Sequence, residues 1–166
     1  MMKNSMKLLN STLFLFFNDE LSNYTEEPQN SEYESFTFRV GGLSFRNRLA
    51  KKTPTKKGYF VVFWEKDKQK QNHAFSFKES PDFLIINIID NYHKGLFLFP
   101  KSVLLKHKIL SGFQSKGKMG IRVYPIWENN LNKTAIKTQK WQLEYFLDLS
   151  IKNLNYKKLE AILKKL

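Results

Sequence analysis

Basic side chains gather in three short stretches of the sequence. The first is the alternating set Arg39, Arg46 and Arg48, the second runs from residue 51 to 57, and the third centres on Lys118 and Arg122. Arginine can fork two phosphate oxygens with parallel donors, and threonine hydroxyls in the second stretch can add single contacts. If the three stretches converge in space, they predict a surface that binds a polyanion, most plainly DNA or RNA.

Two aromatic residues, Tyr124 and Trp127, follow the third stretch, and such rings stack on the bases of an unpaired strand. The predicted nucleic-acid-binding set is Arg39, Arg46, Arg48, Lys51, Thr53, Thr55, Lys56, Lys116, Lys118, Arg122, Tyr124 and Trp127. The competing interpretation is that the arginine row is only solvated and that Trp127 belongs to the core. No helix has the character of a base-reading element, so we expect weak sequence specificity.

Catalytic chemistry has little support. The three histidines, His73, His93 and His107, lack metal-site spacing, and His107 is interpreted as a surface residue. Restriction-type nucleases place a lysine two residues after a metal-binding acid, and none of the 15 Asp and Glu has Lys or Arg at that position. We expect no catalytic residue, no metal and no cofactor. A degenerate metal-dependent nuclease using carboxylates such as Glu32, Glu34 or Glu65 stays open as an alternative.

Composition limits the classes of protein. The 166 residues carry a formal net charge of +13, and 15 phenylalanines supply enough apolar area for a core. This charge suits a nucleic acid, an anionic membrane face or an acidic protein partner, although a lysine-rich proteome would also produce it. The chain has no cysteine, which excludes disulfides and thiol nucleophiles and fits a reducing, cytoplasmic compartment. We expect one domain over residues 1–166.

The N-terminal segment, residues 1–17, is apolar and carries Lys3 and Lys7, but it has no small-x-small cleavage site. Its apolar run is too short to span a membrane. The spacing of Met6, Leu9 and Leu13 predicts an amphipathic helix that packs on a sheet. Peripheral membrane attachment through this segment is a further alternative.

A β-hairpin is the clearest local prediction. Gly41 and Gly42 make a two-residue turn of the kind that favours hairpins. With that turn, Val40 lies opposite Leu43, Phe38 opposite Phe45, and Thr37 opposite Arg46. Because side chains alternate between the faces of a strand, one face should be buried and the other basic. The expected buried side holds Phe36, Phe38, Phe45 and Leu49, and the expected open side holds Arg39, Arg46 and Arg48.

The remaining pattern predicts an α+β fold, a mainly antiparallel sheet flanked by N- and C-terminal helices. Residues 59–64 are expected as a central strand buried on both faces. Further strands are expected at residues 74–77, 83–89, 96–99 and 118–124, and helices at 100–107, 131–147 and 156–166. The lysines of the last helix flank an apolar stripe and are assigned to solubility.

Several blocks of sequence, taken in order over residues 24–147, resemble the MepB family. The blocks are residues 26–33, 45–46, 48–51, 53–58, 64–67, 97–101, 117–118, 122–125, 127 and 137–142. The resemblance implies a small bacterial cytosolic protein whose founding member, in staphylococci, is encoded beside a multidrug efflux pump and its repressor. It also implies a fold related to restriction-endonuclease-like domains, no assigned enzymatic activity, and nucleic-acid binding as the leading function.

Overall fold

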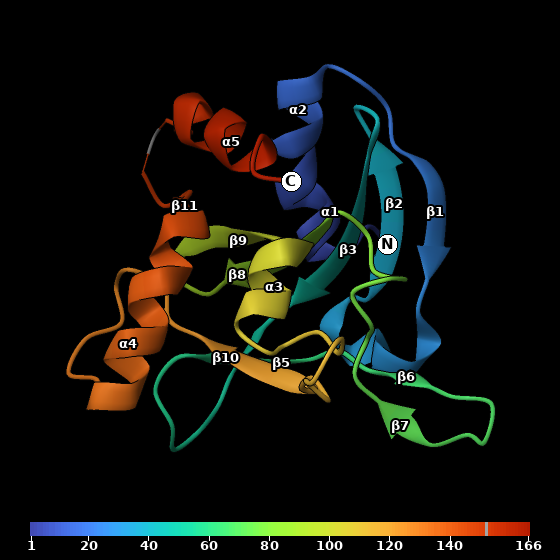
Figure 1. Cartoon of the computed structure of the whole chain (residues 1–166). Helices are drawn as coiled ribbons and strands as arrows, with labels where there is room; N and C mark the ends of the chain where they lie inside the picture. The colour runs from blue at the N-terminus through green and yellow to red at the C-terminus, as the bar shows by residue number, and fades with distance from the viewer. Residues whose placement is uncertain (152) are drawn as a thin grey trace.

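A six-stranded sheet forms the centre of the structure, a computed structural model that describes residues 1–151 and 153–166 (Figure 1). In spatial order its strands are β1 (Ser22–Glu26), β2 (Phe36–Val40), β3 (Leu43–Leu49), β8 (Phe83–Ile89), β9 (Lys94–Pro100) and β11 (Phe146–Asp148). Neighbouring strands are antiparallel except β3 and β8, which are parallel. The expected α+β class with a mainly antiparallel sheet is therefore confirmed.

The predicted hairpin is present with its predicted register. β2 and β3 pair Val40 with Leu43, Phe38 with Phe45, and Thr37 with Arg46. The turn glycines have φ values of +59° and +77°, a conformation that other residues adopt only at a cost. The two-residue turn therefore fixed the register that was read from the sequence.

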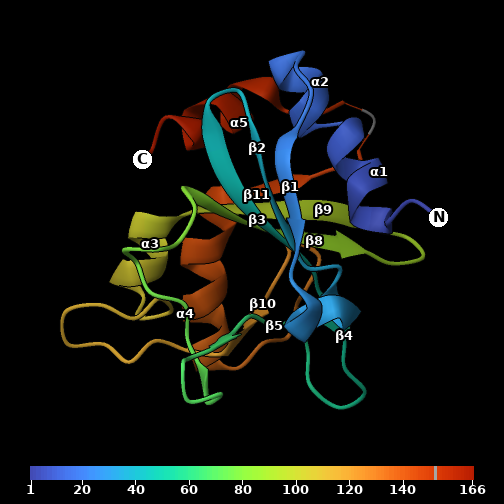
Figure 2. The same cartoon turned by 90° about the vertical axis from the view of Figure 1, so that its right-hand side faces the viewer.

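Three helices cover one face of this sheet, and a second layer covers the other (Figure 2). The three helices are α1 (Asn4–Asn10), α2 (Leu13–Phe17) and α5 (Tyr156–Leu163). The helices pack on the sheet through leucines: Leu9, Leu13 and Leu159 lie against Ile85 and Leu98. All five side chains are buried. The N-terminal segment thus packs on the sheet, as its spacing predicts.

The second layer is built mainly from the chain between β3 and β8 and from the segments after β9. A three-stranded sheet in it has the order β10 (Gly120–Val123), β5 (Tyr59–Val62) and β4 (Lys51–Lys52). Around it lie the 3-10 helix η1 (Pro28–Tyr33), the strand pair β6 (Glu65–Lys66) and β7 (Asn72–His73), the helices α3 (Lys101–Lys106) and α4 (Lys133–Gln142), and the 3-10 helix η2 (Leu143–Tyr145).

Three expectations for this layer are wrong. Strand β5 is central in its small sheet but alternates between buried and half-buried residues, because the layer covers only one of its faces. Residues 74–77 make an isolated bridge between Ser76 and Ser111 instead of a strand. The helix expected to reach residue 147 ends at Gln142, and the chain then joins the main sheet as β11.

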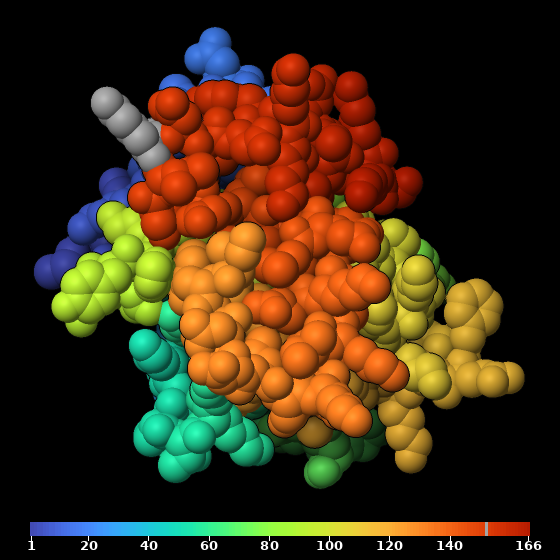
Figure 3. Space-filling model, turned by 90° about the vertical axis from the view of Figure 1, so that its left-hand side faces the viewer, coloured from blue at the N-terminus to red at the C-terminus, as the bar shows by residue number. Residues whose placement is uncertain are grey.

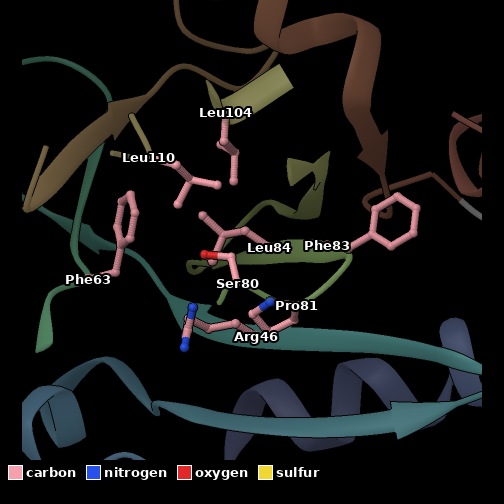
Figure 4. A pocket seen from close by; sticks show the side chains of 8 residues that line it. All are labelled: Arg46, Phe63, Ser80, Pro81, Phe83, Leu84, Leu104 and Leu110. Carbon is pink, nitrogen blue, oxygen red and sulfur yellow. The ribbon is translucent and has the colours of Figure 1, made fainter. Parts of the chain in front are cut away.

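Apolar side chains from both layers meet in the space between them (Figure 4). Leu104 and Leu110 point toward Leu84 of β8, and Phe63 lies beside them. The gap left among these side chains measures ≈ 10 Å³, about the size of one water molecule. Among the described residues, the structure contains no helix with the length and apolarity needed to cross a membrane.

Candidate functional site

Several of the predicted residues line a surface hollow where β10 and β5 meet α3 and α4, and we call this hollow the basic groove. Its volume is ≈ 430 Å³. Its lining includes the cations Lys56, Lys118 and Arg122 and the rings of Phe60, His107, Tyr124 and Trp141. Among the described residues that line it, none is Asp or Glu. Figure 3 shows α4 in orange between the loop before β5, in teal, and the segment before β10, in gold.

Strand β10 is held in place by a buried glutamine. The side chain of Gln142, at the end of α4, accepts a hydrogen bond of 2.9 Å from the Tyr124 amide and donates one of 3.0 Å to the Arg122 carbonyl. The carbonyl oxygen and the nitrogen of its side-chain amide therefore both satisfy backbone groups along the edge of β10, as a neighbouring strand would. This contact fixes α4 beside β10 and presents Arg122 and Tyr124 to the groove.

Arg122 joins two of the three basic stretches. Its Nη1 donates hydrogen bonds of 2.9 Å to Thr53 Oγ1 and 3.2 Å to the Lys57 carbonyl, and its guanidinium lies 5.5 Å from the centre of the Phe60 ring. Thr53 in turn donates to the Lys56 carbonyl. The loop of residues 53–58 is thereby tied to β10, so the second and third basic stretches meet at one site. Thr53 serves to hold Arg122 and the loop.

Tyr124 lies against a glycine whose conformation the loop requires. Gly58 has φ of +80°, and a Cβ atom built on it would lie 2.8 Å from both the Tyr124 ring and the Val123 carbonyl oxygen. Any other residue here would have to adopt a disfavoured backbone conformation and also displace the tyrosine. Gly58 thus allows the close approach of the basic loop to β10.

His107 and Trp141 form a parallel stack in the groove. Their ring centroids are 3.9 Å apart at an interplanar angle of 9°, and Trp141 also packs against Phe99. Burial lowers the pKa of His107, the charges of Lys106 and Lys118 lower it further, and Glu144 opposes them in part. His107 is half-buried and lines a surface hollow, so its interpretation as a surface residue and not a ligand is not contradicted, although its stack with Trp141 was not expected. No local pattern reveals this pair, because tertiary structure alone brings α3 and α4 together.

The hairpin arginines do not reach the groove. Arg48 is 0% exposed and donates hydrogen bonds to Glu27, Asn30 and the Val62 carbonyl. Arg46 pairs with Glu27 at 2.9 Å and lies 3.5 Å above the centre of the Phe75 ring. The expected open arginine face is therefore wrong for these two residues, because η1, β5 and Phe75 cover it.

The other predicted residues lie outside the groove as well. Arg39 is exposed, donates to the Gly42 carbonyl and lines, with Arg46, a separate hollow of ≈ 380 Å³. Lys51 pairs with Glu32 at 2.9 Å. Thr55 and Lys116 are exposed, and they belong to the two segments that supply Lys56 and Lys118 to the groove.

Trp127 lines a third hollow, of ≈ 400 Å³. Its indole Nε1 donates to the hydroxyl of Tyr59 at 3.2 Å, its ring stacks on His93 at 4.5 Å between centroids, and it packs edge-on against Phe146. These contacts fit the core interpretation of Trp127. Among the residues that the structure describes, none lines both this hollow and the basic groove.

The candidate nuclease carboxylates each have another partner. Glu34 accepts hydrogen bonds from the Asn4 and Ser5 amides at the start of α1, and Glu32 pairs with Lys51. Glu65 lies 3.8 Å from His73. Within residues 1–151 and 153–166, no three His, Cys, Asp or Glu side chains gather in a way that could hold a metal ion.

Fold and site together define an α+β protein with a basic, aromatic-lined groove. A family model described as MepB-like matches residues 27–148, and the chain therefore belongs to the MepB-like family. A solved structure described as "Crystal Structure of MepB" is similar, with 46% sequence identity and a TM-score of 0.79 over 91% of this chain and 100% of that chain. Among curated proteins, none matches the chain. The resemblance read from the sequence is confirmed.

Proposed function

We propose that this chain is a non-catalytic nucleic-acid-binding protein that holds a phosphate backbone in the basic groove with low sequence specificity. One observation carries the proposal. Lys56 from the loop before β5 and Lys118 and Arg122 from the stretch that forms β10 converge on one hollow, whose described lining contains no carboxylate. Cations that gather in this way repel one another in the free protein, and a polyanion relieves that repulsion.

The groove offers two kinds of cation. Lys56 and Lys118 are exposed, and neither has an ion-pair partner among the described residues. Arg122 is held in a fixed direction by Thr53 and the Lys57 carbonyl. Flexible lysines suit variable backbone positions, whereas a fixed guanidinium suits one defined phosphate. Contacts to phosphate carry no direct sequence information, which accounts for the low specificity we propose.

The test is binding of fluorescently labelled DNA and RNA, single-stranded and duplex, over a series of salt concentrations. Each phosphate contact should contribute about −0.9 to the log–log slope on duplex DNA and about −0.7 on a single strand. Three groove cations therefore predict a steep loss of affinity with salt. The absence of binding at low salt, together with a stable complex with an acidic protein, would favour the adaptor alternative.

A metal-dependent nuclease is the alternative reaction class. Incubation with supercoiled DNA and Mg²⁺ or Mn²⁺ separates it from simple binding. We expect intact DNA. Cleavage that is lost in Glu65→Ala would overturn the non-catalytic proposal.

Two finer expectations remain part of this proposal. A cytoplasmic location is supported by the cysteine-free sequence, which suits a reducing compartment. The relation to restriction-endonuclease-like domains rests on the family resemblance alone.

A further inference from the structure

We propose that the basic groove receives an unpaired base, which stacks on the paired rings of His107 and Trp141 while the cations hold the adjoining phosphates. The inference rests on the proposed function and adds the class of nucleic acid: a strand with exposed bases. It predicts that bases contribute to affinity, beyond the charge of the backbone.

The first support is the geometry of the stack. At 3.9 Å between centroids and 9° between planes, the His107 and Trp141 rings lie face to face, and this stacked pair is the platform to which a base adds as a further ring. Trp141 is held from the core by Phe99, whose centroid is 5.3 Å away. The platform is therefore fixed before a ligand arrives, so little conformational freedom is lost when a base adds to it.

The second support is that the platform and the cations share one hollow. Lys118 and Arg122 line the same groove as the two rings, and Lys56 completes it from the loop. A volume of ≈ 430 Å³ lies in the range of small-ligand sites, so the groove has room for a nucleotide. A nucleotide joins a flat ring to an anion, which is the combination that this lining offers.

The third support concerns which bases can reach the platform. In a duplex both faces of each base are stacked on neighbouring pairs, so a base must leave the stack to reach a protein ring. An unpaired strand has no such cost. Because every base has an aromatic face, stacking tolerates any sequence, which agrees with weak specificity.

The test compares three labelled probes of equal length: oligo-dT, an abasic oligonucleotide with the same phosphates, and the duplex of the oligo-dT with its complement. We expect oligo-dT to bind roughly tenfold more tightly than the abasic strand, from the usual worth of stacking one base. His107→Ala should reduce the difference between the oligo-dT and abasic affinities. His107→Phe, which keeps an aromatic ring, should restore the difference.

His93→Ala is the matched control, because His93 stacks on Trp127 in a hollow that shares no residue with the groove. It should leave all three affinities unchanged. Equal binding of oligo-dT and the abasic strand would overturn the stacking inference and leave the proposed function intact. No binding of any probe at low salt would overturn both. Loss of oligo-dT binding in His93→Ala equal to that in His107→Ala would also count against the platform.

Discussion

Nη1 of Arg48 donates a hydrogen bond of 2.6 Å to Oε2 of Glu27, in a place where the arginine side chain is fully shielded from water. Burial lowers the pKa of Arg48 to about 10, although the negative charge of Glu27 raises it in part. The guanidinium therefore stays charged at neutral pH. Glu27 also pairs with Arg46. One carboxylate thus pairs with two arginines of β3 and fixes the start of η1 on the sheet.

Glu27→Ala should lower the free energy of unfolding by about 3–5 kcal/mol, because it leaves a buried guanidinium without its carboxylate. Urea denaturation followed by circular dichroism measures this change. Glu32→Ala is the matched control, since Glu32 pairs with Lys51 at the surface and should cost less than about 1 kcal/mol. Equal costs for the two variants would contradict the structural role of Glu27.

This pair also shows where reasoning from the sequence ends. The alternation of side chains along β3 correctly places Arg46 and Arg48 on one face, and the glycine turn gives the correct pairing register of β2 and β3. What covers that face is decided by η1 and β5, which lie outside the hairpin on either side of it in the chain. A sequence pattern indicates which side a residue occupies, but long-range packing determines whether that side meets water.

The same limit applies to the groove. Lys56, Lys118, Arg122 and Tyr124 could be predicted because they lie in basic stretches or on one strand face. His107 and Trp141 could not, because neither has a neighbour in sequence that marks it, and they meet only when α3 packs beside α4. The sequence therefore predicts the cations of the groove and Tyr124, but it does not predict the stack of His107 on Trp141.

Gly58→Ala should destabilise the protein more than Gly42→Ala. Both glycines have positive φ, near +80°, so both substitutions carry the cost of that conformation, about 1–2 kcal/mol. Only at Gly58 would the new methyl group also meet the Tyr124 ring, at 2.8 Å, whereas nothing lies within 4 Å of the Cβ position at Gly42. Thermal unfolding of the two variants measures the difference, and equal melting temperatures would show that Tyr124 does not pack as described.

Nucleic-acid binding should tighten as the pH falls below about 6.5, the ordinary pKa of histidine. In the free protein burial and the nearby lysines hold the pKa of His107 below that value, so the ring is neutral at pH 7. A bound polyanion favours the charged form and raises the pKa, so binding takes up a proton in the window between the two values. Fluorescence anisotropy at constant ionic strength measures the effect.

The variant His107→Gln should flatten this pH dependence while the salt dependence persists. The free protein should also lose stability as the pH falls from about 6.5 through the lowered pKa, because there the unfolded chain binds the proton more readily. A pH profile identical in the variant and the parent protein would show that other groups govern it.

The most direct test of the central claim compares two charge-matched double variants over a salt series. Lys56→Gln with Lys118→Gln removes two cations from the basic groove. Lys157→Gln with Lys164→Gln removes two exposed cations, one from α5 and one from the residue that follows it, on the opposite face of the main sheet. The groove variant should lose affinity, and its log–log salt slope should become shallower by about 1.4 on a single strand or 1.8 on duplex DNA. The α5 variant should behave as the parent protein does. Equal losses in the two variants would mean that total charge, and not the groove, holds the nucleic acid.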